Sequence, residues 1–346
     1  MDHAKRRQPA QRMLLGLIAP GAASLTGDVV QAYVDIARMA EAARLDGLFV
    51  LGREADVDSG HELTLDPVML MAALSSVTEN IGLFAAADPT YDQPYNIARR
   101  IASIDQLSAG RAGWVLTLDP SQDHARNYGL AGLIPHDERH ERAREFAQVV
   151  QGLWDSWDDD AFTMDVSSGR YFDPTKMHIL GHKGRHFMVR GPLNVARSRQ
   201  GRPVIAHDPV DQAGCDLAAA VAEIVRPAAQ TLAEAQAIYA DLKARAAGLG
   251  RDPASLKVMP RFALFGPPEA IADRLQARFE AGAADGFCLE ARSIGDAAAF
   301  AGEVVPEVRR RGVFPTHYDG PYLRHHLGLA IPPATLGGAS ALAVVE

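Results

Sequence analysis

With 346 residues, of which 47% are hydrophobic, the chain is long enough to bury one large α/β core or two smaller ones. A formal net charge of −8 argues against the basic surface that nucleic acids or anionic membranes require, so we expect neither as a partner. Two cysteines in apolar surroundings are too few for a disulfide framework and are typical of buried thiols in a reducing compartment.

The N-terminal segment allows two interpretations. Three basic residues at 5–7 precede the apolar run MLLGLIA and two small residues, a pattern that imitates a secretory signal. Alternatively, residues 13–19 form the first strand of the domain, and cleavage would remove a strand from its centre. We favour the strand and therefore predict a cytoplasmic protein. This apolar run is too short for a membrane span, because Pro20 and Gly21 interrupt it.

Strand-like and helix-like segments then alternate along the chain. The predicted strands are short apolar runs at 13–19, 47–51, 81–87, 112–117, 203–207, 223–226, 257–265 and 286–290. Predicted helices follow them at about 28–44, 67–78, 94–107, 139–157, 213–222, 232–249, 268–281 and 296–311. Strands that are apolar throughout are typical of a parallel sheet with both faces buried.

Eight βα units are the number that closes a parallel barrel. We therefore predict an α/β fold, a (β/α)8 TIM barrel with its functional site at the carboxyl ends of the strands. An open doubly wound sheet is the main alternative. It favours a glycine-rich phosphate-binding turn after the first strand, which the sequence APGA at 19–22 matches poorly.

We expect a single barrel domain over residues 1–330. Residues 158–202 form an excursion between the fourth helix and the fifth strand, with a hairpin near 186–189. The apolar residues of 312–330 are expected to pack on the barrel or on a partner, and 331–346 are expected to form a flexible tail.

The stretch 94–114, PYNIARRIASIDQLSAGRAGW, is the most informative part of the sequence. Pro94 begins a helix at no cost, because the first N–H of a helix has no internal partner. Apolar residues spaced as in a helix, among them Leu107, predict one buried face, and Gly110 lets the chain turn into the next strand.

This stretch closely resembles the flavin-dependent monooxygenases of the bacterial luciferase superfamily, in the nitrilotriacetate and dibenzothiophene-sulfone monooxygenase branch. The resemblance covers nearly the whole chain, including LTLDPVMLMAALSSVTENIGL, GRHFMVRGPLNVARSRQGRPVI and PEAIADRLQARFEAGAADGF. It implies a luciferase-like barrel that binds reduced FMN (FMNH2) from a separate flavin reductase. With dioxygen, such an enzyme inserts one oxygen atom into a small organic substrate, in a cavity that keeps water out. Relatives commonly pair through barrel helices, so we expect a homodimer or a heterodimer with a homologue.

The resemblance also implies which residues bind the cofactor. His136 lies where the family has a flavin-contacting histidine, and Thr90 and Tyr91 match the family in type after the third strand. His140 occupies the place of a family tyrosine, and we include it among the cofactor-binding candidates. A solvent-facing histidine at a helix start and structural turn residues are the alternatives for these positions. No catalytic residue is assigned.

Several positions depart from the family pattern. Gly52 replaces an aspartate and Asp88 replaces a serine or threonine. The phosphate-holding sequence Ala-Gly-Ser-Ser after the fifth strand reads Asp208-Pro209-Val210-Asp211 here. Two carboxylates would repel a phosphate, at about 4 kcal/mol for each contact at ~4 Å and an effective dielectric of ~20. A long family segment after the seventh strand is also missing, which predicts a shortened lid over the site.

Two other functions follow from these departures. The chain would be a homologue that has lost flavin binding and acts as a non-catalytic binding or partner subunit. Alternatively, it would bind riboflavin or a deazaflavin fragment without phosphate, with the acidic loop holding ribityl hydroxyls.

Histidine spacing raises the question of a metal site. His136 and His140 share one helix face, as paired metal ligands do, but Glu138 does not match the zinc-protease helix motif. We therefore predict no metal there. The histidines at 178, 182 and 186 recur every four residues around two glycines and are assigned to a surface loop.

Overall fold

A parallel sheet lies at the centre of the computed structural model, which describes residues 12–21, 24–25, 27–52, 65–118 and 120–336. Its strands run in the spatial order β10-β11-β1-β2-β3-β4-β7-β8-β9. Their bounds are β1 (Leu14–Ile18), β2 (Gly47–Val50), β3 (Gly82–Ala87), β4 (Ala112–Leu116), β7 (Val204–His207), β8 (Ile224–Val225), β9 (Lys257–Val258), β10 (Arg261–Ala263) and β11 (Gly286–Glu290). Every neighbouring pair in this sheet is parallel.

The seventh predicted strand is divided in two. β9 pairs with β8 and β10 pairs with β11, and only Met259 and Pro260 separate the two pieces in the chain. A proline has no N–H to donate, so the ladder is interrupted at this point. Because the first and last strands of the order belong to one segment, the sheet curls back on itself. The predicted parallel α/β sheet is thus confirmed as a curled sheet, with nine strand pieces in place of eight strands.

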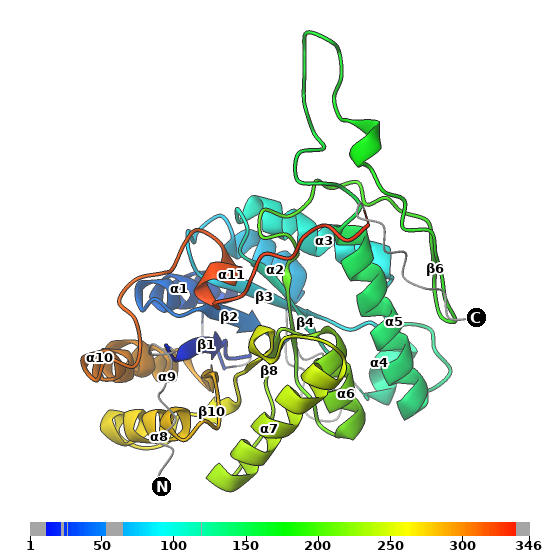
Figure 1. Ribbon diagram of the computed structural model, residues 1–346. Coiled ribbons are helices and arrows are strands. Elements are labelled where there is room, and N and C mark those ends of the chain that lie inside the picture. The colour runs from blue at the N-terminus through cyan, green and yellow to red at the C-terminus, as the bar shows by residue number, and fades with distance from the viewer. Residues whose placement is uncertain (1–11, 22–23, 26, 53–64, 119, 337–346) are drawn as a thin grey trace, which may run out of the picture.

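Helices cover the outside of the curled sheet (Figure 1). Their bounds are α1 (Val29–Ala42), α2 (Pro67–Leu74), α3 (Pro94–Leu107), α4 (Gln122–Asn127), α5 (His136–Trp154), α6 (Gln212–Val221), α7 (Leu232–Gly248), α8 (Pro268–Glu280), α9 (Ile294–Ala299), α10 (Val305–Arg310) and α11 (Leu323–His326). A π-turn, Phe300–Val304, joins α9 to α10, and 3-10 turns lie at Pro174–Lys176 and Pro253–Ser255. Within the described residues, none of the helices combines the length and the apolar character needed to cross a bilayer.

The first strand was one of two interpretations of the N-terminal segment. β1 pairs with β11 on one side and with β2 on the other, so residues 14–18 form a central strand, as we predicted. The basic residues at 5–7 lie outside the described residues.

Helix α3 shows how the apolar pattern is used. Ile97, Ile101 and Ile104 are fully or nearly fully buried, and Trp154 of α5 donates a hydrogen bond to the Ala98 carbonyl at 3.0 Å. Leu107 was predicted on the same buried face, but it is 66% exposed. It lies in the last turn of α3 and lines an open groove opposite α2.

Two aromatic rings fill the middle of the curled sheet. Phe49 of β2 and Phe84 of β3 stack with their ring centroids 4.2 Å apart. Gly16, Gly47 and Gly113 make room for them, since a Cβ atom at each of these positions would meet one of the two rings within 2.2–2.8 Å. The sheet therefore encloses a packed apolar layer and no open pore.

Helix α11 lies at the amino ends of the strands. Leu323 and Leu327 are buried among the side chains inside the sheet, and the Leu323 N–H donates to the Gly110 carbonyl at 3.0 Å. Further along, the Pro332 carbonyl accepts a hydrogen bond from Arg197, and the Thr335 N–H donates to Asp155. Residues 337–346 of the expected tail lie outside the described residues.

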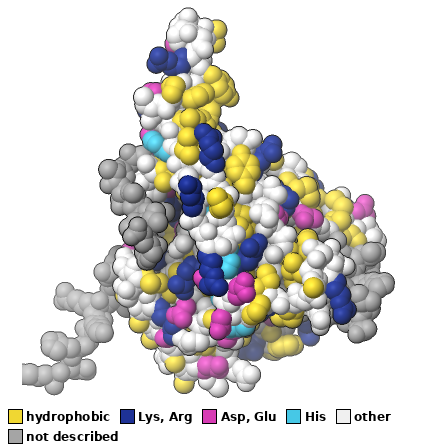
Figure 2. All heavy atoms as spheres, turned by 90° about the vertical axis from the view of Figure 1, so that its right-hand side faces the viewer, with side chains coloured by type: hydrophobic (Ala, Val, Ile, Leu, Met, Phe, Trp, Pro, Cys, Tyr) yellow, Lys and Arg dark blue, Asp and Glu magenta, His cyan; other side chains and the backbone are white. Residues whose placement is uncertain are grey.

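Part of the excursion at 158–202 extends away from the sheet as an arm (Figure 1), while its last residues pack back on α3, where the buried Gln200 donates to Asp105. Strands β5 (His182–Lys183) and β6 (Met188–Val189) pair antiparallel, which confirms the predicted hairpin. The histidines of the arm contact carboxylates: His178 lies 3.0 Å from Asp158, and His182 lies 3.0 Å from Glu145. Figure 2 shows hydrophobic atoms exposed along this arm, to which Met164, Val166 and Tyr171 contribute.

Candidate functional site

Two ion pairs stand at the carboxyl ends of the strands. Asp208 follows β7 and Arg226 follows β8, and the guanidinium donates to both carboxylate oxygens at 2.6 and 2.9 Å. Arg261 of β10 pairs with Glu290 at the end of β11. Ala206 faces the inside of the sheet, and side chains alternate along a strand, so Asp208 two residues later lies on the same inner face.

Arg226 is the most deeply buried of these charges. Its side chain is fully buried, and its guanidinium lies 4.5 Å above the centroid of the Phe49 ring. The Nη1 nitrogen is buried and has no hydrogen-bond partner among the described residues, although the Cys288 thiol lies next to the guanidinium. A buried N–H without an acceptor is costly, so this nitrogen points to a ligand acceptor at the strand ends.

Thr90 and Tyr91 lie in the turn after β3, where they were predicted. The Thr90 N–H donates to Asp88 at 2.7 Å, while its buried hydroxyl has no hydrogen-bond partner within the described ranges. Tyr91 stacks on Tyr128 with centroids 4.8 Å apart, next to α4. Asp88, a departure from the family pattern, therefore fixes the turn that presents Thr90.

His136, His140 and Asp211 come together although Asp211 is far away in the sequence. His136 Nε2 lies 2.7 Å from Asp211 Oδ2, and its Nδ1 lies 2.8 Å from Asp137 Oδ1. His140 Nδ1–H donates to the His136 carbonyl at 2.9 Å, and its Nε2 lies 3.9 Å from Asp211 Oδ1. Asp211 also caps α6, because Oδ1 accepts the Gly214 N–H at 2.7 Å.

These contacts change the protonation of the group. Hydrogen bonds to Asp137 and Asp211 raise the pKa of His136 above its usual value. Partial burial alone would raise the pKa of Asp211, but hydrogen bonds from Gly214 and His136 outweigh it and lower that pKa. Both shifts favour the charged forms, so they favour an imidazolium–carboxylate pair.

His207, the last residue of β7, is a buried neighbour of this group. Burial lowers the pKa of His207, and its Nδ1–H donates to the Leu116 carbonyl at 2.8 Å. Ile205 packs in the layer between sheet and helices, so the alternation places His207 on that side and away from the inside of the sheet. Its Nε2 is buried without a partner.

The strand ends fit the ring system of a flavin better than its phosphate. The isoalloxazine edge carries carbonyl oxygens and ring nitrogens, which the unpartnered groups of Arg226 and Thr90 match as hydrogen-bond donors. A phosphate would ordinarily use the N-terminus of α6, where the Asp211 carboxylate already accepts the Gly214 N–H.

The expected repulsion from the 208–211 loop needs correction. Asp208 is neutralised by Arg226, and Asp211 lies beside His136, whose charged form it favours, so the loop does not present two unpaired carboxylates. Three charged residues at the strand ends were not among the predicted site residues: Arg226, Arg261 and Glu290. The sequence contains a signal for two of them, since Arg226 and Glu290 end predicted strands, whereas Arg261 lies in the middle of one.

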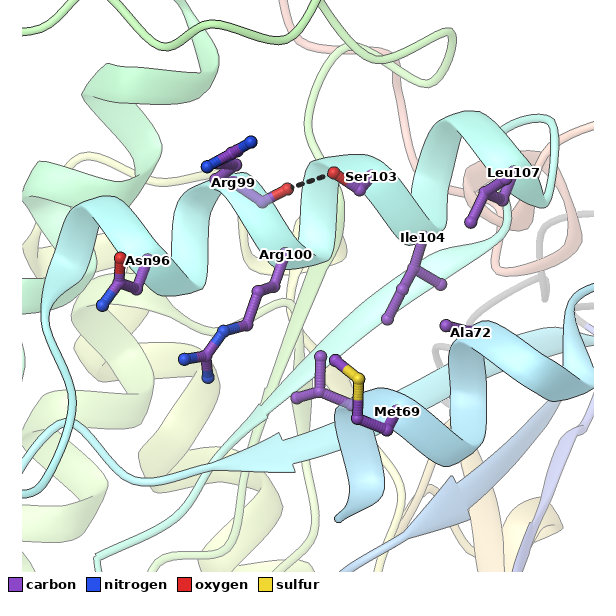
Figure 3. Close-up of a pocket in the computed structure, with 9 residues that line it drawn as sticks. Met69, Ala72, Asn96, Arg99, Arg100, Ser103, Ile104 and Leu107 are labelled. Atoms are coloured by element: carbon purple, nitrogen blue, oxygen red, sulfur yellow. Dashed lines mark hydrogen bonds between the residues drawn. The ribbon is translucent and has the colours of Figure 1, made fainter.

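A separate groove lies on the outer surface between α2 and α3 (Figure 3). It has a volume of ≈ 220 Å³, and Met69 and Ala72 on α2 face Ile104 and Leu107 on α3. Because it lies outside the sheet, away from the strand ends, we do not assign the reaction to it.

Comparison with known proteins gives consistent matches. A model of the luciferase-like monooxygenase family matches residues 13–265. The chain is 33% identical to N-acetyl-S-(2-succino)cysteine monooxygenase of Bacillus subtilis (strain 168), over 91% of this chain and 92% of the relative. It is also 33% identical to nitrilotriacetate monooxygenase component A of Aminobacter aminovorans, over 88% and 90%. The structure of EDTA monooxygenase from Chelativorans sp. BNC1 superposes with a TM-score of 0.84 at 27% identity, covering 94% of this chain and 100% of the other.

Proposed function

This chain belongs to the luciferase-like monooxygenase family, and we propose that it holds reduced FMN at the carboxyl ends of its strands. It is a flavin-dependent monooxygenase, an oxidoreductase that inserts one atom of dioxygen into a small organic substrate. The resemblance found in the sequence is confirmed, including the nitrilotriacetate branch. The comparisons offer no support for a non-catalytic subunit.

The observation that carries the flavin site is the buried guanidinium of Arg226. Its unpartnered Nη1 lies at the strand ends, above the Phe49 ring and beside a neutralising carboxylate. A fixed N–H donor in a dry site stabilises negative charge on a bound ring more strongly than water does. When bound, reduced FMN supplies the two electrons that activate dioxygen.

Other residues complete the proposed site. The hydroxyl of Thr90 donates to or accepts from the ring edge, and Tyr91 forms part of the wall next to α4. His136 and His140 stand at the phosphate end, beside Asp211. The stacked Phe49 and Phe84 rings form an apolar floor that keeps water away from the reacting atoms.

The partner proteins are part of the proposal. A component A is named among the relatives, which supports a two-component system in which a separate flavin reductase supplies FMNH2. We propose a homodimer or a heterodimer with a homologue through the groove between α2 and α3, where Met69 and Leu107 are 58% and 66% exposed. The cytoplasmic location rests on the two unpaired cysteines, Cys215 and Cys288.

The proposed lid is short. Only residues 264–267 connect β10 to α8. The alignment with the Bacillus relative spans 411 positions against 346 residues here, so that relative carries segments that this chain lacks. A shorter cover leaves room for a neighbouring subunit or for the substrate itself to exclude water.

A titration tests the proposal. Wild-type protein and His136→Ala are titrated with reduced and oxidised FMN and with riboflavin, and binding is followed by fluorescence and calorimetry. We expect FMN to bind the wild type, and to bind His136→Ala several-fold more weakly. His178→Ala, a histidine of the arm, is the matched control and should keep the wild-type affinity. No binding at high micromolar flavin would overturn the proposal in favour of the non-catalytic subunit. Tight riboflavin with weak FMN would favour the phosphate-free cofactor.

A further inference from the structure

We propose that His136, His140 and Asp211 bind a divalent transition-metal ion, and that this ion coordinates the phosphate of FMN. The metal site is argued from the geometry of the three side chains. The coordination of the FMN phosphate rests on the proposed function.

The three side chains are close enough to share one ion. One ligand atom from each lies within 4.8 Å of the others, and no other three such side chains in the described part of the chain come this close. Bonds from zinc to nitrogen and oxygen ligands measure about 2.1 Å, so ligands of one tetrahedral ion lie roughly 3.4 Å apart. His140 Nε2 lies 3.9 Å from Asp211 Oδ1, and His136 Nε2 lies 2.7 Å from Asp211 Oδ2. The imidazoles thus face different oxygens of one carboxylate, and the three side chains must shift by up to roughly 1 Å to share one ion.

Each side chain already has the outer partner that a metal ligand needs. His140 donates its Nδ1–H to the His136 carbonyl, which leaves Nε2, on the side of Asp211, as the nitrogen that can bind an ion. His136 directs Nδ1 to the Asp137 carboxylate and Nε2 to Asp211. Asp211 is oriented by the Gly214 N–H. Partners of this kind fix the tautomer and the ring orientation of metal-binding histidines.

The donor set selects the class of ion. Two imidazoles and one carboxylate suit zinc and its first-row neighbours, and magnesium and calcium prefer oxygen ligands alone. Three protein ligands leave a further position for water or for an oxygen of another molecule.

A bound ion resolves the conflict at the start of α6. Asp211 presents a carboxylate where a phosphate would bind, and His136 offsets it by one charge at most, whereas a divalent ion beside the carboxylate leaves a net positive charge. The ion thereby replaces the hydroxyl and N–H donors that the Asp208-Pro209-Val210-Asp211 loop lacks. A phosphate oxygen then fills the open coordination position.

The first experiment measures the ion alone. Protein passed over a chelating resin is titrated with Co²⁺, and binding is read from its visible d–d absorption, with Zn²⁺ as competitor. We expect one equivalent to bind with the absorption of a four-coordinate ion. His140→Gln and Asp211→Asn should weaken binding by about tenfold or more. An asparagine oxygen still caps α6. His178→Gln, outside the group, should bind as the wild type does. No stoichiometric binding, or unchanged binding by His140→Gln, would overturn the proposal.

The second experiment compares FMN with riboflavin on the same protein, with and without Zn²⁺. We expect Zn²⁺ to raise the FMN affinity about tenfold or more, equivalent to about 1.4 kcal/mol, and to leave riboflavin binding unchanged. If Co²⁺ binds but Zn²⁺ leaves the FMN affinity unchanged, the metal site stands, and the proposal that its ion binds the phosphate of FMN is overturned. Binding of Co²⁺ without binding of either flavin would support the metal site and contradict the proposed function instead.

Discussion

Arg226 shows how a single residue organises the strand ends. Its guanidinium is a planar fork that donates one hydrogen bond to each oxygen of the Asp208 carboxylate, and it lies 4.5 Å from the centroid of the Phe49 ring. A lysine would offer only a point charge and would not satisfy both oxygens in this way. The remaining nitrogen, Nη1, is thereby held in a fixed direction, without an acceptor in the part of the chain that the structure describes.

Removing Arg226 tests this arrangement. We expect Arg226→Met to lower the free energy of unfolding by about 2 kcal/mol, because Asp208 keeps a largely buried charge without its partner. The double variant Arg226→Met/Asp208→Leu also removes the unpaired carboxylate, so it should recover most of the lost free energy of unfolding. Urea unfolding of the wild type and both variants measures the difference. Equal losses in the single and double variants would contradict an ion pair of this kind.

The site was predicted only in part, for a physical reason. The position of His136 at a helix start is a local feature, and the sequence contains it. The contact of His136 with Asp211 spans 75 residues and exists only after β4 and β7 pair, so local patterns do not contain it. The ion pair of Asp208 with Arg226 likewise forms only in the folded sheet, so the sequence alone predicted Asp208 as an unpaired charge that repels a phosphate.

At the scale of elements, the glycines of the strands fit the aromatic layer. We expect Gly113→Ala to destabilise the protein by about 1–3 kcal/mol, because its Cβ would lie 2.2 Å from the Phe84 ring. Gly132→Ala is the matched control, since nothing lies within 4 Å of a Cβ there, and its effect should stay within about 0.5 kcal/mol. Combining Gly113→Ala with Phe84→Leu should cost less than the sum of the single changes. Strict additivity, measured by urea unfolding, would show that the ring and the glycine are not in contact.

The strands were easier to predict than some of the helices. Apolar runs predicted the location of every piece of the central sheet, because strands buried on both faces leave an unbroken apolar signal. Helix α4 was missed, since Gln122–Asn127 contains five polar residues and no apolar period. Leu107 was wrongly predicted to be buried, because periodicity gives the face of a helix but not how closely the next helix packs on that face.

At the scale of the whole molecule, the groove between α2 and α3 is the proposed contact with a second subunit. We expect the wild type to be a dimer and the double variant Met69→Glu/Leu107→Glu to be a monomer, because a dimer would bury these introduced charges without partners. Val166→Glu on the arm, where Val166 is 95% exposed, is the matched control and should remain dimeric. Size-exclusion chromatography with light scattering distinguishes the two states. A monomeric wild type, or a dimeric double variant, would contradict pairing through this groove.

Helix α11 ties the end of the described chain to the amino ends of the strands, and one buried histidine makes this contact sensitive to acid. Burial lowers the pKa of His326 to about 4, while its Nε2–H donates to the Gly320 carbonyl and its ring packs on Tyr318. In the unfolded chain a histidine takes up a proton near pH 6.5. Between these two values only the unfolded chain binds the proton, so stability is lost as the pH falls.

From pH 7 to pH 5 we expect His326 to contribute a loss of about 2 kcal/mol in the free energy of unfolding, at about 1.36 kcal/mol for each pH unit below 6.5. His326→Gln keeps an N–H donor for Gly320 but does not titrate, so its stability should fall less over the same range. Arg12, His325 and Asp319 act on the His326 charge and are present in both proteins, so the difference between their pH profiles isolates the histidine. Urea unfolding at both pH values gives that difference. Parallel profiles would mean that His326 is not held neutral in the folded protein, and that α11 does not seal the amino ends of the strands as tightly as its burial indicates.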